Sequence, residues 1–131
     1  MKIKSQNFDH LNEIPLVYTI KNRGLSPSLY WYDYPTNSKI FLILMTNLKT
    51  NKIYWATFTN KSTIDINEKT GGEMVNSFGK VEYTPPNDID DIVTYKISVY
   101  SIINPNLNYE ELISDNNLLD VGNIKFIYNG Y

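Results

Sequence analysis

Cysteine is absent from the 131 residues of the chain, which excludes a disulfide framework, a thiol nucleophile and a cysteine-ligated zinc or iron–sulfur site. Arginine occurs once, as Arg23, and histidine once, as His10. The 14 acidic residues outnumber the 12 basic ones, so the formal charge is −2 and there is no cationic surface of the kind that binds duplex nucleic acid. We therefore expect no nucleic-acid partner.

Long apolar runs are absent as well. No segment reaches the roughly 18 apolar residues of a membrane-spanning helix, and no apolar stretch follows the basic residues of positions 1–6. The sequence therefore predicts no membrane span, no secretory signal and a cytoplasmic location. Asn, Ile, Lys and Tyr are abundant, a bias typical of AT-rich genomes such as those of large DNA viruses, protists or low-GC bacteria. For a viral source, the predicted location is the host cytoplasm or the virion.

The segment from Lys39 to Thr59 is the centre of the predicted fold. Six consecutive apolar residues, Ile40 to Met45, lie between turn-forming residues and are rich in branched and aromatic side chains, a pattern typical of a buried strand. After a turn at positions 46–51, Ile53 to Phe58 has the composition of a second strand. The length of 131 residues fits a single domain, residues 1–131, with one core.

Further strands and one short helix complete the prediction. Val93–Ile102 shows the clearest alternation of apolar and polar residues, and Asn108 followed by Glu111 predicts the capped start of a short helix with Leu112, Ile113 and Leu119 on its apolar side. Other expected strands are Met1–Ser5, Glu13–Thr19, Thr63–Ile66, Lys80–Tyr83 and Ile124–Tyr128. The sequence thus predicts a mainly β protein, an antiparallel β-sandwich with one short helix near the C-terminus.

Candidate metal ligands and catalytic residues are few. Asp88, Asp90 and Asp91 could bind a divalent cation through oxygen ligands, but they also fit a solvated acidic loop, which is our prediction. His10 lies beside Asp9 without a serine or cysteine nucleophile motif. We therefore predict no catalytic residues, no metal site and no cofactor.

The order of several short motifs resembles that of the phosphatidylethanolamine-binding proteins, especially the compact bacterial-type members. Ser26-Pro27-Ser28-Leu29-Tyr30-Trp31 is similar to the family's Ser-Pro-x-Leu-x-Trp, and Tyr83-x-Pro85-Pro86 is similar to its Tyr-Gly-Pro-x-Pro-Pro loop. Tyr54-Trp55 stands where the family has His-Trp, and Val93-Thr94-Tyr95 where it has His-Arg-Tyr. The resemblance runs from about Ile14 to Tyr128 and implies the family's β-sandwich.

In that family, an Asp-Pro-Asp motif, two histidines and the proline loop line a small pocket for phosphate-like or carboxylate anions. Here Thr46-Asn47-Leu48, Tyr54 and Val93 replace the acids and the imidazoles. The resemblance therefore implies a degenerate pocket with neutral hydrogen-bond donors. The predicted ligand-binding residues are Thr46, Tyr54, Tyr83, Pro86 and Tyr95, with the alternative that they fill what was once a pocket.

Two functions follow from the resemblance. The first is a non-enzymatic module that binds a small anion or a phospholipid headgroup, or regulates a protein partner. For the family's eukaryotic members, the resemblance implies partners that are signalling proteins such as kinases. The alternative is a structural or host-interaction protein, of viral origin in one version, that keeps the fold without ligand binding.

Overall fold

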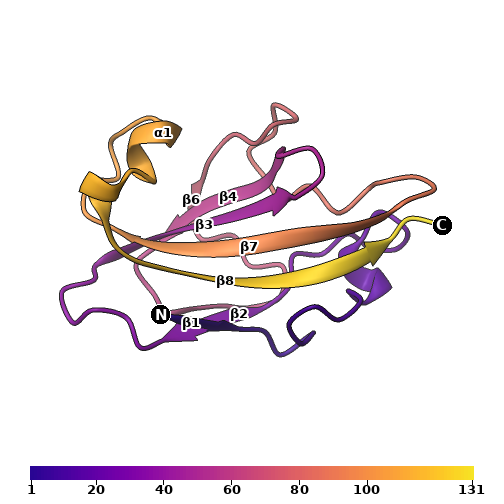
Figure 1. Cartoon of the computed structure of the whole chain (residues 1–131), viewed down its shortest axis with the longest axis horizontal. Helices are drawn as coiled ribbons and strands as arrows, with labels where there is room; N and C mark the ends of the chain where they lie inside the picture. The colour runs from indigo at the N-terminus through magenta and orange to yellow at the C-terminus, as the bar shows by residue number, and fades with distance from the viewer.

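The computed structural model describes residues 1–131 and consists of two antiparallel sheets that pack face to face (Figure 1). The larger sheet has the strand order β6-β4-β3-β7-β8, and the smaller one β1-β2-β5. The strands are β1 (Lys2–Lys4), β2 (Leu29–Tyr32), β3 (Ile40–Asn47), β4 (Ile53–Thr59), β5 (Thr63–Ile64), β6 (Gly72–Glu73), β7 (Ile92–Ile102) and β8 (Leu118–Asn129). The helical segments are η1 (Leu16–Tyr18), α1 (Tyr109–Leu112) and η2 (Asp115–Asn117). The predicted β-sandwich with one short α-helix is confirmed.

Strand β3 is the middle strand of the larger sheet, and apolar side chains cover both of its faces. Phe41, Ile43 and Met45 belong to the core of 19 buried residues between the sheets, whereas Leu42 and Leu44 belong to a second apolar cluster on the outer face. A strand with two buried faces has no need of polar alternation. This explains the six-residue apolar run that marked the strand in the sequence.

Strands β7 and β8 are the longest in the molecule and cross it side by side (Figure 1). The alternation of β7 directs Val93, Tyr95 and Ile97 into the core, as predicted. Strand β8 begins six residues earlier than predicted, at Leu118, and runs through Gly122 without a break. Gly122 fits because the backbone of Met1, directly before β1, approaches it closely: a Cβ at position 122 would lie 2.6 Å from the carbonyl oxygen of Met1.

Helix α1 begins as predicted, because the side chain of Asn108 accepts a hydrogen bond from the backbone N–H of Glu111 at 2.9 Å. The helix ends at Leu112, however, and the predicted apolar side is wrong beyond this residue, since Leu119 belongs to β8. Leu112 is completely buried and covers the second apolar cluster on the outer face of the larger sheet.

Two predicted strands are wrong. Residues 80–83 form no strand because the side chain of Asn76 organises them, accepting from the N–H of Lys80 at 3.1 Å and donating to the carbonyl oxygen of Glu82 at 3.0 Å. Such local hydrogen bonds compete with strand pairing. In the Glu13–Thr19 segment, Glu13 makes only an isolated bridge to Ile127, and Leu16–Tyr18 forms a 3₁₀ turn after Pro15. None of the helices is long and apolar enough to cross a membrane.

Candidate functional site

A cluster of tyrosines fills the core at the end of the larger sheet that lies away from α1. Tyr95 on β7 is completely buried, and its ring meets that of Tyr54 on β4 edge to face at 5.0 Å. Phe126 stacks on Tyr95 at 5.2 Å, and Tyr128 meets it edge to face at 6.5 Å. We call Tyr54, Tyr95, Phe126 and Tyr128 the tyrosine cluster. Its stacked and edge-to-face contacts hold the rings in fixed positions.

The carboxylate of Asp88 accepts hydrogen bonds from this cluster and from the adjoining strand. The hydroxyl of Tyr95 donates to Oδ2 at 2.5 Å, and the side-chain amide of Asn47 donates to Oδ1 at 3.0 Å. The hydroxyl of Tyr54 donates to the neighbouring Asn87 at 2.8 Å. The loop that carries Asn87 and Asp88 thus supplies the acceptors for all three of these donors.

Asn47 is the residue that connects the loop to the end of β3. It is completely buried, and its Oδ1 accepts from the backbone N–H groups of Lys49 and Thr50 at 2.9 and 3.2 Å. An asparagine whose side chain accepts from the backbone N–H groups two and three residues later stabilises a tight turn. The same amide therefore shapes the β3–β4 turn and holds the carboxylate of Asp88.

The other end of the acidic loop is fixed by backbone contacts. Gly130 donates to the carbonyl oxygen of Asp91 at 2.7 Å and accepts from the N–H of Asp90 at 3.0 Å. A Cβ at Gly130 would lie 2.5 Å from the carbonyl oxygen of Asp88. Asp91 forms an ion pair with Lys49, and this contact lowers the pKa of the Asp91 carboxyl. The carboxylates of Asp88 and Asp91 thus have separate partners, and no group of three potential metal ligands is found in the structure.

Two hydroxyl groups of the cluster, those of Tyr95 and Tyr128, have a raised pKa. Burial, followed by the hydrogen bond to Asp88, raises the pKa of Tyr95. Burial, with a smaller effect of the charge of Asp88, raises the pKa of Tyr128, whose buried hydroxyl has no hydrogen-bond partner. Neutral phenols beside a carboxylate act as hydrogen-bond donors rather than as bases.

The structure brings together only part of the predicted set. Tyr54 and Tyr95 adjoin each other, and Pro86 is buried in the loop before Asn87, with its carbonyl oxygen accepting from the N–H of Ile20 at 3.1 Å. The hydroxyl of Tyr83 is directed elsewhere and donates to the carbonyl oxygen of Tyr18 at 2.9 Å.

Thr46 does not join the cluster. It lies on the outer face of the larger sheet, where Oγ1 contacts the carbonyl oxygen of Lys96 at 3.5 Å and the side chain lines a cavity of about 280 Å³. Neither Tyr54 nor Pro86 lines any of the five principal cavities of the molecule.

Three residues of the cluster's surroundings are missing from the predicted set: Asn47, Asn87 and Asp88. Strand alternation could have identified Asn47, because Phe41, Ile43, Met45 and residue 47 share one face of β3. No sequence signal separates Asp88 from the neighbouring acids, since its role depends on how the loop folds back towards β7.

Comparison with known proteins identifies the fold. No protein-family model matches the chain. It is 33% identical over 81 residues to a UPF0098 protein of Aquifex aeolicus, a match that spans 62% of this chain and 45% of that relative's length. Among solved structures, it is similar to CT736 of Chlamydia trachomatis, a homologue of the phosphatidylethanolamine-binding proteins. The TM-score is 0.84 at 20% identity, over 98% of this chain and 96% of the other.

A second similar structure is YbcL of Escherichia coli, a member of the mammalian phosphatidylethanolamine-binding protein family, with a TM-score of 0.82 and 14% identity over 98% of this chain and 97% of the other. The resemblance seen in the sequence motifs is thereby confirmed at the level of the fold, which extends over nearly the whole chain.

Proposed function

We propose that this chain, which has the phosphatidylethanolamine-binding-protein fold, is a non-enzymatic interaction module that acts through a protein partner and does not bind a headgroup anion. One observation supports this proposal above all: the carboxylate of Asp88 already accepts from Tyr95 and Asn47. This corresponds to the alternative that the sequence left open, a protein that keeps the fold without ligand binding.

Energetics favour the internal carboxylate over an external anion. A phosphate that reached Tyr95 would lie within a few ångströms of Asp88, and two like charges at about 4 Å repel by about 4 kcal/mol at an effective dielectric constant of about 20. A hydrogen bond to a charged group contributes about 1.5–3 kcal/mol. One such bond does not exceed the repulsion. Two bonds contribute about 3–6 kcal/mol but give no net gain, because the same two donors would first have to give up their bonds to Asp88.

The absence of a catalytic arrangement supports the non-enzymatic part of the proposal. Around Asp88 the side chains that contact it are a neutral phenol and an amide, which donate hydrogen bonds and provide no nucleophile paired with a base. His10, the only imidazole, lies against β8, where Nδ1 accepts from the backbone N–H of Lys125 at 3.1 Å. The cytoplasmic location, or the virion for a viral source, remains a prediction from the sequence.

The experiment is a titration of the protein with phosphoethanolamine, followed by backbone amide NMR. We expect no saturable shift in the wild-type protein at millimolar ligand. In Asp88→Ala, which removes the carboxylate that accepts from Tyr95 and Asn47, we expect saturable shifts around these two residues.

Asp65→Ala is the matched control, because it removes one acid from an exposed position far along the chain. It should behave as the wild type. Saturable wild-type shifts around Tyr54 and Tyr95 would contradict the proposal and favour headgroup binding instead.

A further inference from the structure

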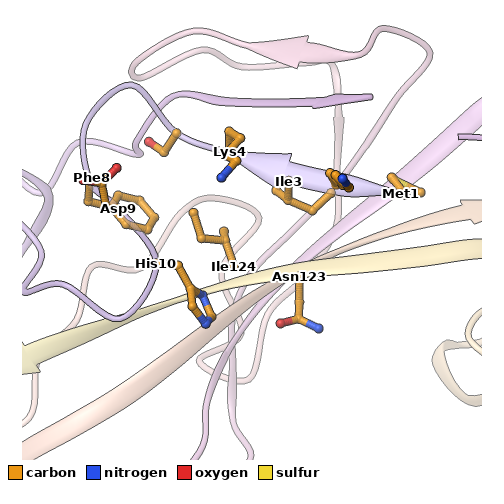
Figure 2. Close-up of a pocket in the computed structure, with 10 residues that line it drawn as sticks. Met1, Ile3, Lys4, Phe8, Asp9, His10, Asn123 and Ile124 are labelled. Atoms are coloured by element: carbon orange, nitrogen blue, oxygen red, sulfur yellow. The ribbon is translucent and has the colours of Figure 1, made fainter. Parts of the chain in front are cut away.

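The largest cavity of the molecule, about 650 Å³, is a groove where β1 lies beside β8 (Figure 2). The side chains that are buried there, Ile3, Phe8 and Ile124, are apolar and belong to the main core, so this groove presents no buried hydrogen-bonding side chain to a ligand. A smaller cavity does. It has a volume of about 310 Å³ and lies where the loops around residues 24–26, 67–69 and 81–83 meet β4 and β6. We call it the loop cavity.

Two buried polar side chains in the loop cavity have no hydrogen-bond partner. Ser26 is 5% exposed and Trp55 is 3% exposed, and both line this cavity and none of the other four principal cavities. The hydroxyl of Ser26 and the indole N–H of Trp55 form no hydrogen bond, yet neither is sealed from solvent. The sealed side-chain atoms without a partner are the indole nitrogen of Trp31 and the hydroxyl of Tyr128. The groups of Ser26 and Trp55 therefore open into the loop cavity.

Packing and backbone contacts hold these two groups in place. The ring of Trp55 meets that of Tyr83, another lining residue, edge to face at 5.4 Å. The backbone N–H of Asn67 donates to the carbonyl oxygen of Ser26 at 2.9 Å and ties the loop around residue 67 to this side of the cavity. A cavity whose polar groups are already fixed loses little conformational entropy when it binds a ligand.

Carboxylates dominate the charge of the lining. Glu68, Glu73 and Glu82 line the loop cavity with a single cation, Lys69, so three negative charges and one positive charge give a net charge of −2. None of the four forms an ion pair, since the two ion pairs of the molecule join other residues. Glu68 and Glu73 are half-buried, and in each of them one carboxylate oxygen accepts from a backbone N–H of its own loop, at 3.1 and 3.3 Å. The second oxygen of each carboxylate stays free for a ligand.

We propose that the loop cavity binds a small ammonium compound that carries at least two hydroxyl groups. Its ammonium group donates to the carboxylates of Glu68, Glu73 and Glu82 in charge-assisted hydrogen bonds. Its hydroxyl groups bind the indole N–H of Trp55, which can only donate, and the hydroxyl of Ser26, which donates and accepts. The volume of about 310 Å³ also admits a larger member of this class, such as an amino sugar. The site is distinct from the tyrosine cluster and takes a cation, so the inference goes beyond the proposed function.

The test is a titration of the full chain with serinol, an ammonium compound with two hydroxyl groups, followed by heteronuclear NMR of the two indole N–H groups. We expect the Trp55 indole signal, assigned by its loss in Trp55→Phe, to shift saturably at millimolar serinol. The sealed indole of Trp31 is the internal control and should not shift. Two probes of similar size separate the parts of the ligand: glycerol has a hydroxyl in place of the ammonium group, and isopropylamine lacks both hydroxyls. Each should bind about tenfold more weakly than serinol.

Substitutions in the lining test the role of the carboxylates. Glu68→Gln/Glu73→Gln keeps the oxygens that accept from the backbone and removes two charges, so it should weaken serinol binding about tenfold while the Trp31 signal shows an intact fold. Glu110→Gln/Glu111→Gln is the matched control, because both residues are exposed and line none of the five principal cavities, and it should bind as the wild type does. The proposal is overturned by an unshifted Trp55 indole signal, by equal binding of glycerol or isopropylamine, or by unchanged binding in Glu68→Gln/Glu73→Gln.

Discussion

Replacement of Asn47 by alanine should destabilise the protein far more than removal of a typical surface amide. The variant loses the bond to the Asp88 carboxylate, for which we take about 2 kcal/mol. It also loses the two bonds to the backbone N–H groups of Lys49 and Thr50, at about 0.5 kcal/mol each because both residues are exposed and water replaces the acceptor. The bond to the Tyr95 hydroxyl, at 3.3 Å, is long and adds little. The expected loss of unfolding free energy is therefore about 3 kcal/mol. With a urea m-value of about 2 kcal/mol/M, the midpoint falls by about 1.5 M.

Urea unfolding monitored by tryptophan fluorescence measures this loss, with the exposed Asn60→Ala as a control that should change stability by less than about 0.5 kcal/mol. Asn47→Asp separates the two roles of the amide, because it keeps the acceptor for the turn and replaces the donor by a second carboxylate beside Asp88. We expect Asn47→Asp to be at least as destabilising as Asn47→Ala. A loss below about 1 kcal/mol in both variants would refute the role assigned to Asn47.

Three further predictions concern other parts of the fold. Burial raises the pKa of Tyr95 above the ordinary value of about 10, so above about pH 10 the unfolded chain binds fewer protons than the folded one. The free energy of unfolding therefore falls by up to about 1.4 kcal/mol per pH unit. Tyr95→Phe should make the fall of stability with alkaline pH less steep, and an unchanged slope would contradict this. Leu112→Ala should cost about 3 kcal/mol in thermal or urea unfolding, because this completely buried side chain covers the outer apolar cluster, and a loss below about 1 kcal/mol would show that α1 is not needed there. Gly122→Ala should cost about 1–3 kcal/mol, since its Cβ would lie 2.6 Å from the carbonyl oxygen of Met1 and displace β1; a wild-type urea midpoint would exclude that close approach.

The sequence predicted the strands whose apolar pattern reflects burial. Strands β3 and β7 were identifiable because one is buried on both faces and the other alternates over most of its length. The strand predicted at Lys80–Tyr83 is wrong because the amide of Asn76, several residues earlier, binds the backbone of this segment. A local pattern does not contain that contact.

The candidate site was only partly predictable for a similar reason. Comparison of motifs along the chain led to Thr46, but the side chains of β3 alternate, and the outer face takes Thr46 while the inner face takes Asn47. Tyr54 and Tyr95 were identifiable from the positions they occupy in the motif order. The role of Asp88 depends on a tertiary contact between a loop and two strands, which composition and spacing do not encode.

The most direct test of the central claim, that an internal carboxylate occupies the donors of Tyr95 and Asn47, is a crystal structure of the protein grown in a high concentration of phosphate. We predict that Asp88 accepts from Tyr95 and Asn47 in that crystal and that no phosphate lies at these donors. A phosphate hydrogen-bonded to the hydroxyls of Tyr54 and Tyr95, with Asp88 displaced into solvent, would contradict the claim and show that the protein binds headgroup-like anions.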